Sequence, residues 1–114
     1  MKLSKINIEV ALDEHKMPES ISWTAPEGGM EQTQKAKSLL LGFWDEQENS
    51  ALRIDLWTKN MRIDEMNDFF FQSFIGMADT FTRATNHPEL ANEIKTFAKS
   101  FHKKVVDTLN KEAQ

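Results

Sequence analysis

Ala51-Leu52-Arg53-Ile54-Asp55-Leu56-Trp57-Thr58 is the stretch that decides the fold of this 114-residue chain. Leu52, Ile54 and Leu56 alternate with the Arg, Asp and Trp between them, which is the period of a strand with one apolar face. A strand of this kind must bury that face against other elements. We therefore predict a strand over residues 51–58 and look for its partners on both sides.

The upstream half predicts two more strands and one helix. Polarity alternates over residues 3–13 and again over 19–25, and two strands this close in sequence are expected to form a hairpin. Pro26-Glu27-Gly28-Gly29 ends the second strand. A 3.6-residue apolar stripe predicts a helix over residues 31–45; its members are Ala36, Leu39, Leu40, Phe43 and Trp44.

The downstream half predicts two long helices. The first covers residues 64–85, with Asp64 as its N-cap, and the second runs from Pro88 to about Lys111. The predicted order is therefore ββαβαα, in one α+β domain spanning residues 1–114. We expect a small three-stranded antiparallel sheet with the helices packed on its apolar face.

The composition excludes several classes of protein. There is no Cys, so disulfides and thiolate chemistry are absent. The net charge is −4, which disfavours nucleic-acid and anionic-lipid partners. We expect no signal peptide, because the first ten residues alternate in polarity, and no stretch reaches the ~20 apolar residues of a transmembrane segment. We expect a cytoplasmic protein.

No pattern of catalytic or metal-binding residues is present. His15, His87 and His102 lack neighbouring ligands at metal-binding spacing, so we expect no metal and no cofactor. The acidic pairs, such as Asp13-Glu14 and Asp45-Glu46, fall in turns, where carboxylates stay solvated. The serines lack the base and the strained turn that a nucleophile needs. The sequence therefore argues against an enzyme.

Arg53, Asp55 and Trp57 on the outer face of the predicted sheet form the first candidate binding surface, because Trp and Arg are enriched at binding hot spots. Lys5, Asn7 and Glu9 would lie beside them if the first and third strands are neighbours. In the alternative interpretation, Trp57 packs under a loop and Arg53 pairs with Asp55 or Glu9.

Phe71 and Ile75 form the second candidate surface. The long helix is apolar over roughly 240°, whereas a surface helix needs little more than ~100°. This helix must therefore contact two partners, and in one interpretation part of the arc, around Phe71 and Ile75, stays open for another subunit or protein. The alternative is that the whole arc is buried between the sheet and a neighbouring helix.

Two segments carry a resemblance to a known family. They are residues 52–61, Leu-Arg-Ile-Asp-Leu-Trp-Thr-Lys-Asn-Met, and residues 77–86, Met-Ala-Asp-Thr-Phe-Thr-Arg-Ala-Thr-Asn. Together with Trp23, Gly28-Gly29, Ala36-Lys37 and Trp44-Asp45, they resemble the gliding motility protein GldC family over nearly the whole chain. The family pattern ends the strand with Asp-Met-Pro, where this chain has Asn60-Met61-Arg62.

The resemblance implies an accessory component of the gliding apparatus of Bacteroidetes-type bacteria, with no catalytic residues to transfer. We therefore favour a non-catalytic module that binds a protein partner of the gliding machinery. The alternative is a carrier of small apolar ligands, with a pocket between sheet and long helix lined by Phe70, Phe74, Met77 and Trp44. Homodimerisation is compatible with both hypotheses.

Overall fold

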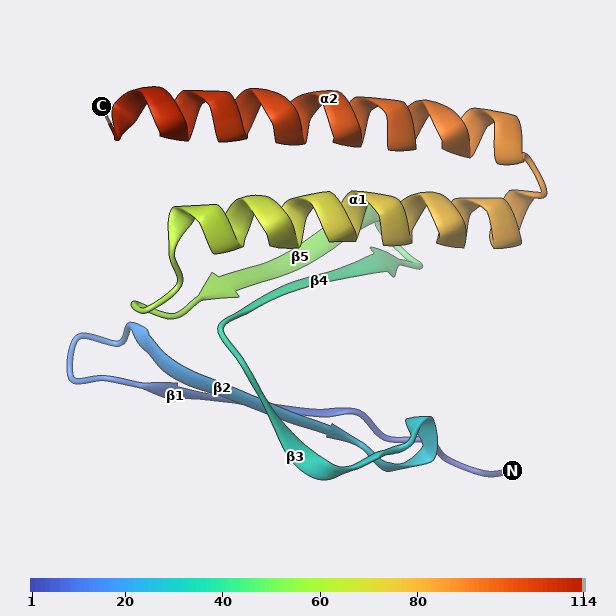
Figure 1. Ribbon diagram of the computed structural model, residues 1–114. Coiled ribbons are helices and arrows are strands. Elements are labelled where there is room, and N and C mark those ends of the chain that lie inside the picture. Colours follow the sequence, from blue (N-terminus) through green and yellow to red (C-terminus); the bar gives the residue numbers. More distant parts are fainter. Residues whose placement is uncertain (114) are drawn as a thin grey trace. The chain divides into compact units, whose positions relative to one another are not determined.

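The computed structural model describes residues 1–113 and contains five strands followed by two long helices (Figure 1). The elements are β1 (Asn7–Leu12), β2 (Pro18–Ala25), the 3₁₀ turn η1 (Pro26–Gly28), β3 (Met30–Ala36), β4 (Ser38–Asp45), β5 (Ser50–Trp57), α1 (Ile63–Thr85) and α2 (Pro88–Glu112). The α+β class is confirmed, but the predicted order ββαβαα is wrong. The chain forms two compact units, Met1–Met61 with all strands and Arg62–Gln114 with both helices. The organisation as one domain stays a prediction.

The helix predicted for residues 31–45 is wrong, because this segment forms β3 and β4. A short apolar run fits either period, and the run from Leu39 to Trp44 was assigned to the helical one. Gly42 in its middle costs a helix roughly 0.5–1 kcal/mol relative to Ala. In the extended form, β4 pairs with β5 over all eight of its residues, which satisfies backbone groups that β5 would otherwise leave unpaired.

The single three-stranded sheet is also wrong, because the strands form two antiparallel sheets. One has the order β1-β2-β3 and the other is the hairpin β4-β5. The predicted β1-β2 hairpin is confirmed, but β5 pairs with β4 and not with β1. Lys5, Asn7 and Glu9 therefore do not flank Arg53. The six-residue span from Asp45 to Ser50 brings β4 next to β5 locally, and local pairing costs less chain entropy than pairing with β1.

The turns follow from their residues. Asn49, at φ 49°, closes the β4-β5 turn, and the Asp45 carboxylate accepts a hydrogen bond from the Glu48 N–H at 2.8 Å. In the β1-β2 turn the Asp13 carboxylate accepts from the His15 and Met17 N–H groups and pairs with the Lys59 ammonium. The Lys59 hydrogen bond is the main cause that lowers the pKa of Asp13.

Ile21 is the most buried large side chain of the strand unit, with 1% of its surface exposed. It lies in the central strand β2, directly between Val10 of β1 and Ala36 of β3. Ile8 lies on the same face, opposite Trp23, but is 39% exposed. This face carries the apolar side chains of the sheet, and Asn7 and Glu9 lie on the other.

Replacing Ile21 with Ala should lower the free energy of unfolding by roughly 2–5 kcal/mol, because it leaves a cavity in a packed site. The same change at Ile8, on the same face, should cost clearly less. Urea denaturation followed by circular dichroism measures both. Equal losses from the two variants would contradict the assigned core.

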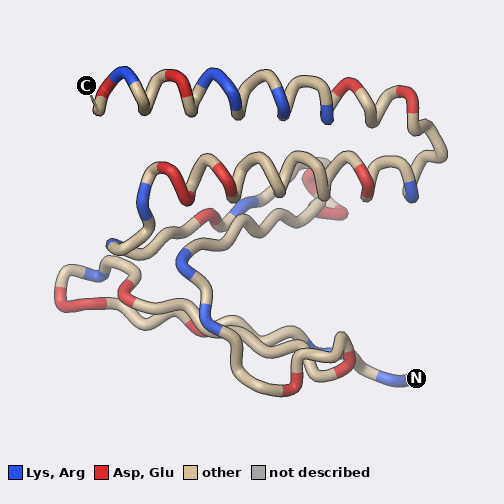
Figure 2. Tube along the Cα trace, viewed as in Figure 1, with Lys and Arg blue, Asp and Glu red and all other residues tan. Residues whose placement is uncertain are grey.

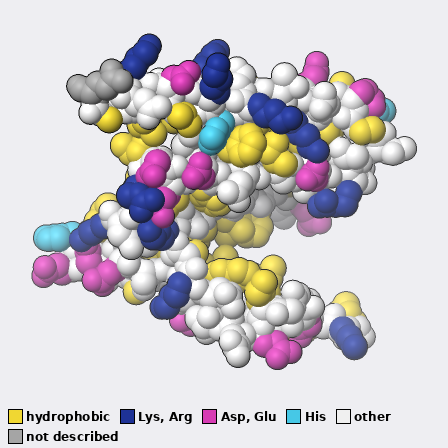
Figure 3. Space-filling model, viewed as in Figure 1, with side chains coloured by type: hydrophobic (Ala, Val, Ile, Leu, Met, Phe, Trp, Pro, Cys, Tyr) yellow, Lys and Arg dark blue, Asp and Glu magenta, His cyan; other side chains and the backbone are white. Residues whose placement is uncertain are grey.

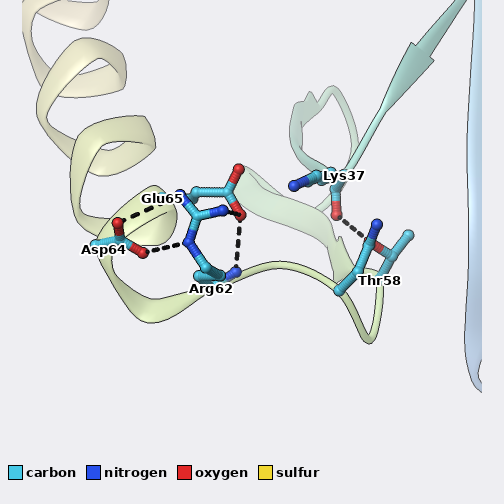
Figure 4. Close-up of polar contacts among 6 residues, drawn as sticks. Lys37, Thr58, Arg62, Asp64 and Glu65 are labelled. Atoms are coloured by element: carbon cyan, nitrogen blue, oxygen red, sulfur yellow. Dashed lines mark hydrogen bonds and ion pairs between the residues drawn. The ribbon is translucent and has the colours of Figure 1, made fainter.

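The helical unit is an antiparallel hairpin with defined ends. The Glu65 carboxylate accepts from the Arg62 N–H at 3.0 Å, and the Arg62 guanidinium pairs with Asp64 (Figure 4). Arg62 is thus the N-cap of α1, and the predicted N-cap Asp64 lies inside the helix. Asn86 ends α1 in the left-handed conformation at φ 59°, and Pro88 begins α2 as predicted.

Aromatic rings and small residues hold α1 against α2. Phe74 makes edge-on contacts with Phe97 and Phe101 of α2, at centroid distances of 5.7 and 6.4 Å. Figure 3 shows hydrophobic side chains gathered along this seam. Ala78 and Ala98, at 0% and 1% exposure, are the small residues that let the two helices approach closely.

Polar side-chain contacts lie beside the seam, and α2 carries Lys residues over its later turns (Figure 2). Lys95 pairs with Asp79 at 2.8 Å, and His102 Nε2 lies 3.2 Å from Asp68 Oδ1. Both pairs join the two helices.

Replacing Ala78 with Leu should destabilise the helical hairpin by roughly 1–3 kcal/mol, because the closely packed site has no room for three more carbon atoms. Ala84→Leu is the matched control, since Ala84 is exposed on the same helix. Thermal unfolding compares the two variants. A similar loss in melting temperature for both would show that the two helices are not closely packed at Ala78.

Candidate protein-interaction surface

The β4-β5 hairpin has two faces of different chemistry, fixed by its register. Directly paired residues share a face, and the pairs Trp44–Ala51, Gly42–Arg53, Leu40–Asp55 and Ser38–Trp57 form one of them. We call this the tryptophan face. The pairs Leu39–Leu56, Leu41–Ile54 and Phe43–Leu52 lie on the opposite face and make it apolar as far as the terminal pair Asp45–Ser50.

Arg53 and Asp55 form an ion pair in the middle of the tryptophan face. The guanidinium Nε and Nη2 donate to the two carboxylate oxygens, each at 2.9 Å. Gly42 leaves space for this arrangement, because a Cβ there would lie 3.1 Å from Arg53 Nη1. The hydrogen bond from Arg53 is the main cause that lowers the pKa of Asp55, and the pair stays half exposed to solvent.

Two exposed tryptophans flank this ion pair. Trp57 is 59% exposed and Trp44 is 68% exposed. Trp57 is therefore not packed under a loop, although Arg53 does pair with Asp55 as the alternative interpretation supposed. Trp44 was missed by the sequence analysis, which placed it on a helical stripe. Trp44 follows Leu40 and Gly42 at steps of two residues, which is the spacing of one strand face, and this spacing could have identified it.

The second candidate surface belongs to the helical unit. Phe71 and Ile75 of α1 are both half-buried. The Phe71 ring lies against His102 of α2, with centroids 4.9 Å apart. Phe71 thus already contacts a neighbouring helix, as the burial alternative required. As partner-binding residues, Phe71 and Ile75 stay a prediction.

The apolar face of the hairpin is an exposed feature that the sequence did not identify. Phe43, Leu52 and Ile54 are 56%, 54% and 50% exposed. Isolated apolar residues on a surface need no explanation, but three neighbours on two paired strands form a patch. The prediction that Leu52, Ile54 and Leu56 share one side of the strand is confirmed; the exposure of Leu52 and Ile54 was not foreseen.

Each of the two units contains an open hollow. An open apolar hollow of about 190 Å³ in the strand unit is lined by Ile6, Ile8, Ile21, Trp23, Ala36 and Ser38–Leu41. Pockets for small molecules usually measure ~300 Å³ or more. A second, of about 530 Å³, lies beside the α1-α2 connection and is lined by polar side chains, among them Asp79, Arg83 and Lys95.

The four residues predicted to line the ligand pocket come from both units. Trp44 is exposed on β4, and Phe70, Phe74 and Met77 belong to α1. Phe74 is already occupied by ring contacts with Phe70 and α2. The ligand-carrier alternative stays a prediction.

The three histidines belong to three different segments of the chain. His15 is exposed in the β1-β2 turn, His87 contacts Glu89 at the start of α2, and His102 contacts Asp68. Among residues 1–113, no three His, Asp or Glu side chains converge as a metal site would require. In the same range, neither helix has the length and hydropathy to span a membrane.

These features define a small α+β protein whose distinctive surface is a β-hairpin with aromatic, charged and aliphatic groups facing outward. A family profile described as gliding motility-associated protein GldC-like matches residues 18–107. The chain therefore belongs to the GldC-like family, which confirms the resemblance seen in the sequence. Neither a curated protein nor a solved structure matches it.

The Arg53–Asp55 ion pair predicts that the pKa of Asp55 changes when Arg53 is replaced. Because Arg53 lowers the pKa of Asp55, the stabilisation by this pair is complete above the unfolded-state pKa and is lost as the pH falls through the lowered value. Replacing Arg53 with Met should raise the pKa of Asp55 toward its ordinary value of 3.8. Carboxyl ¹³C NMR titration measures it.

Arg62→Met is the matched control for this titration. Arg62 and Asp64 have the same spacing, and their hydrogen bond lowers the pKa of Asp64. The control should raise the pKa of Asp64 and leave that of Asp55 unchanged. An Asp55 titration insensitive to Arg53→Met would contradict the ion pair.

Proposed function

We propose that this protein is a non-catalytic accessory component of gliding motility that acts in the cytoplasm by binding a protein partner of the gliding machinery. The gliding association rests on membership of the GldC-like family. The binding role rests on one observation, the tryptophan face of the β4-β5 hairpin.

The chemistry of that face fits recognition of a protein. Trp44 and Trp57 expose large rigid rings, whose ordering on binding costs little conformational entropy. Arg53 lies between them with its guanidinium already fixed by Asp55, so its donors are oriented before a partner arrives. Trp and Arg are the residues over-represented at interface hot spots.

The same face is a poor site for catalysis. Its two charged groups neutralise each other in a surface pair half open to water. A general acid or base needs a pKa moved toward the working pH, whereas the pKa of Asp55 is moved further below it. The lowered value keeps the carboxylate ionised and paired.

A gliding strain lacking the protein and complemented with variants tests the proposal. Replacing Arg53 and Trp57 with Ala should leave the protein folded and abolish most of the spreading that wild type restores, because it removes two groups of the binding face. Affinity capture from the same cells should then lose one or more gliding components. Trp44→Ala should give a weaker defect in the same direction.

Met30→Ala/Lys35→Ala is the matched control, since it also removes one exposed apolar group and one exposed cation, from β3. It should spread and capture like wild type. Normal spreading and unchanged capture by the Arg53/Trp57 variant, at wild-type abundance, would show that the tryptophan face is not the binding site.

A further inference from the structure

The outer edge of β5 is a long strand edge without the usual protection. Within residues 1–113, β5 pairs only with β4, over eight residues without a bulge. It contains no Pro and no Lys, which commonly keep an edge strand from pairing, and its two charged residues, Arg53 and Asp55, have opposite signs. Two-stranded ribbons are marginal on their own and gain stability from further strands.

The direction of the free backbone groups follows from the ladder. The Thr58 N–H points toward β4 and donates to the Lys37 carbonyl oxygen at 2.8 Å (Figure 4). The Leu56 carbonyl oxygen also points toward β4, where it accepts a hydrogen bond from Ser38 Oγ. Directions alternate along an antiparallel strand. Residues 51, 53, 55 and 57 therefore point their N–H and C=O groups to the outer edge.

The sequence of β5 is complementary to itself in one antiparallel register. If Ile54 lies opposite Ile54 of a second copy, Arg53 lies opposite Asp55 and Asp55 opposite Arg53. The residues that exchange backbone hydrogen bonds in this register are 51, 53, 55 and 57, the ones with outward groups. The same register places Leu52 opposite Leu56 on the apolar face, so charge, hydrogen bonding and hydropathy agree.

The other free edges lack this complementarity. β1 contains Glu9 as its only charged residue and has a register shift between Ala11 and Leu12. The only charged residue of β4 is Asp45, at the end of the strand. β3 contains Glu31 and Lys35, but its pairing with β2 is irregular between Trp23 and Ala25. β5 combines a regular eight-residue strand with balanced charges at its centre.

We propose that two copies of this chain associate through the outer edges of β5, in the register centred on Ile54, to form a continuous four-stranded sheet β4-β5-β5-β4. Each copy would then place Trp57 next to Ala51 of the other, which itself neighbours Trp44. The dimer would join the two tryptophan faces into one surface. The self-association does not depend on the proposed function, because it is measured on the purified protein alone.

Two single variants test the register. Arg53→Glu places a second carboxylate opposite Asp55, and Asp55→Lys places a second cation opposite Arg53, so each variant repels its own copy at two symmetric positions. Each should raise the dimer dissociation constant by about tenfold or more.

An equimolar mixture of the two variants should restore association. The glutamate introduced in one chain then faces the lysine introduced in the other, and the unchanged Asp55 of the first chain faces the unchanged Arg53 of the second. A heterodimer should therefore form. Sedimentation velocity with one variant fluorescently labelled measures this.

The controls separate the edge from the rest of the chain. Arg62→Glu and Asp64→Lys reverse a pair of the same spacing outside the sheet and should leave the dimer intact. The double variant Arg53→Glu/Asp55→Lys restores opposite charges and should dimerise, which also shows that the changed strand still folds. A monomeric wild type over the whole accessible concentration range would overturn the proposal. So would single variants that dimerise normally, or a mixture that stays monomeric.

Discussion

Antiparallel pairing of β4 with β5 is the constraint on which the strand unit depends. Eight consecutive pairs, from Ser38–Trp57 to Asp45–Ser50, determine which side chains share a face. A shift of one residue would move Arg53 and Asp55 among the leucines and place Leu52 and Ile54 among the tryptophans. The Asp45–Ser50 turn prevents such a shift, because the Asp45 carboxylate and the left-handed Asn49 fix where the chain reverses.

The same pairing of β4 with β5 also determines where the Arg53 and Asp55 side chains lie on the tryptophan face. Gly42 lies directly opposite Arg53, and its missing side chain gives the guanidinium room to lie flat and meet both oxygens of Asp55. The ion pair in turn occupies the strip between Trp44 and Trp57. Exposed ion pairs contribute little to stability, so its main physical effect is to hold polar groups in place on an otherwise aromatic face.

The sequence predicted the elements whose period is unambiguous. The long apolar stripe of α2, the alternation of β5 and the β1-β2 hairpin all appeared as expected, because α2 keeps the helical period over 25 residues and the strands alternate between apolar and polar side chains. The helix expected over residues 36–44 is wrong because six apolar residues within nine positions fit both helical and extended spacing. That one error removed the two strands β3 and β4, merged two sheets into one and assigned Trp44 to a core. Arg53, Asp55 and Trp57 were still placed together, because their relation depends only on β5.

The distribution of the aromatic residues has an optical consequence. The chain has three Trp and no Tyr, so its near-ultraviolet emission comes from tryptophan alone. Two of the three indoles belong to the hairpin and are largely in contact with water, whereas Trp23 lies half-buried in the other sheet. The hairpin therefore carries its own fluorophores, so a molecule that covers these two indoles should shift their emission wavelength without a dye or tag. The helices α1 and α2 contain no Trp of their own.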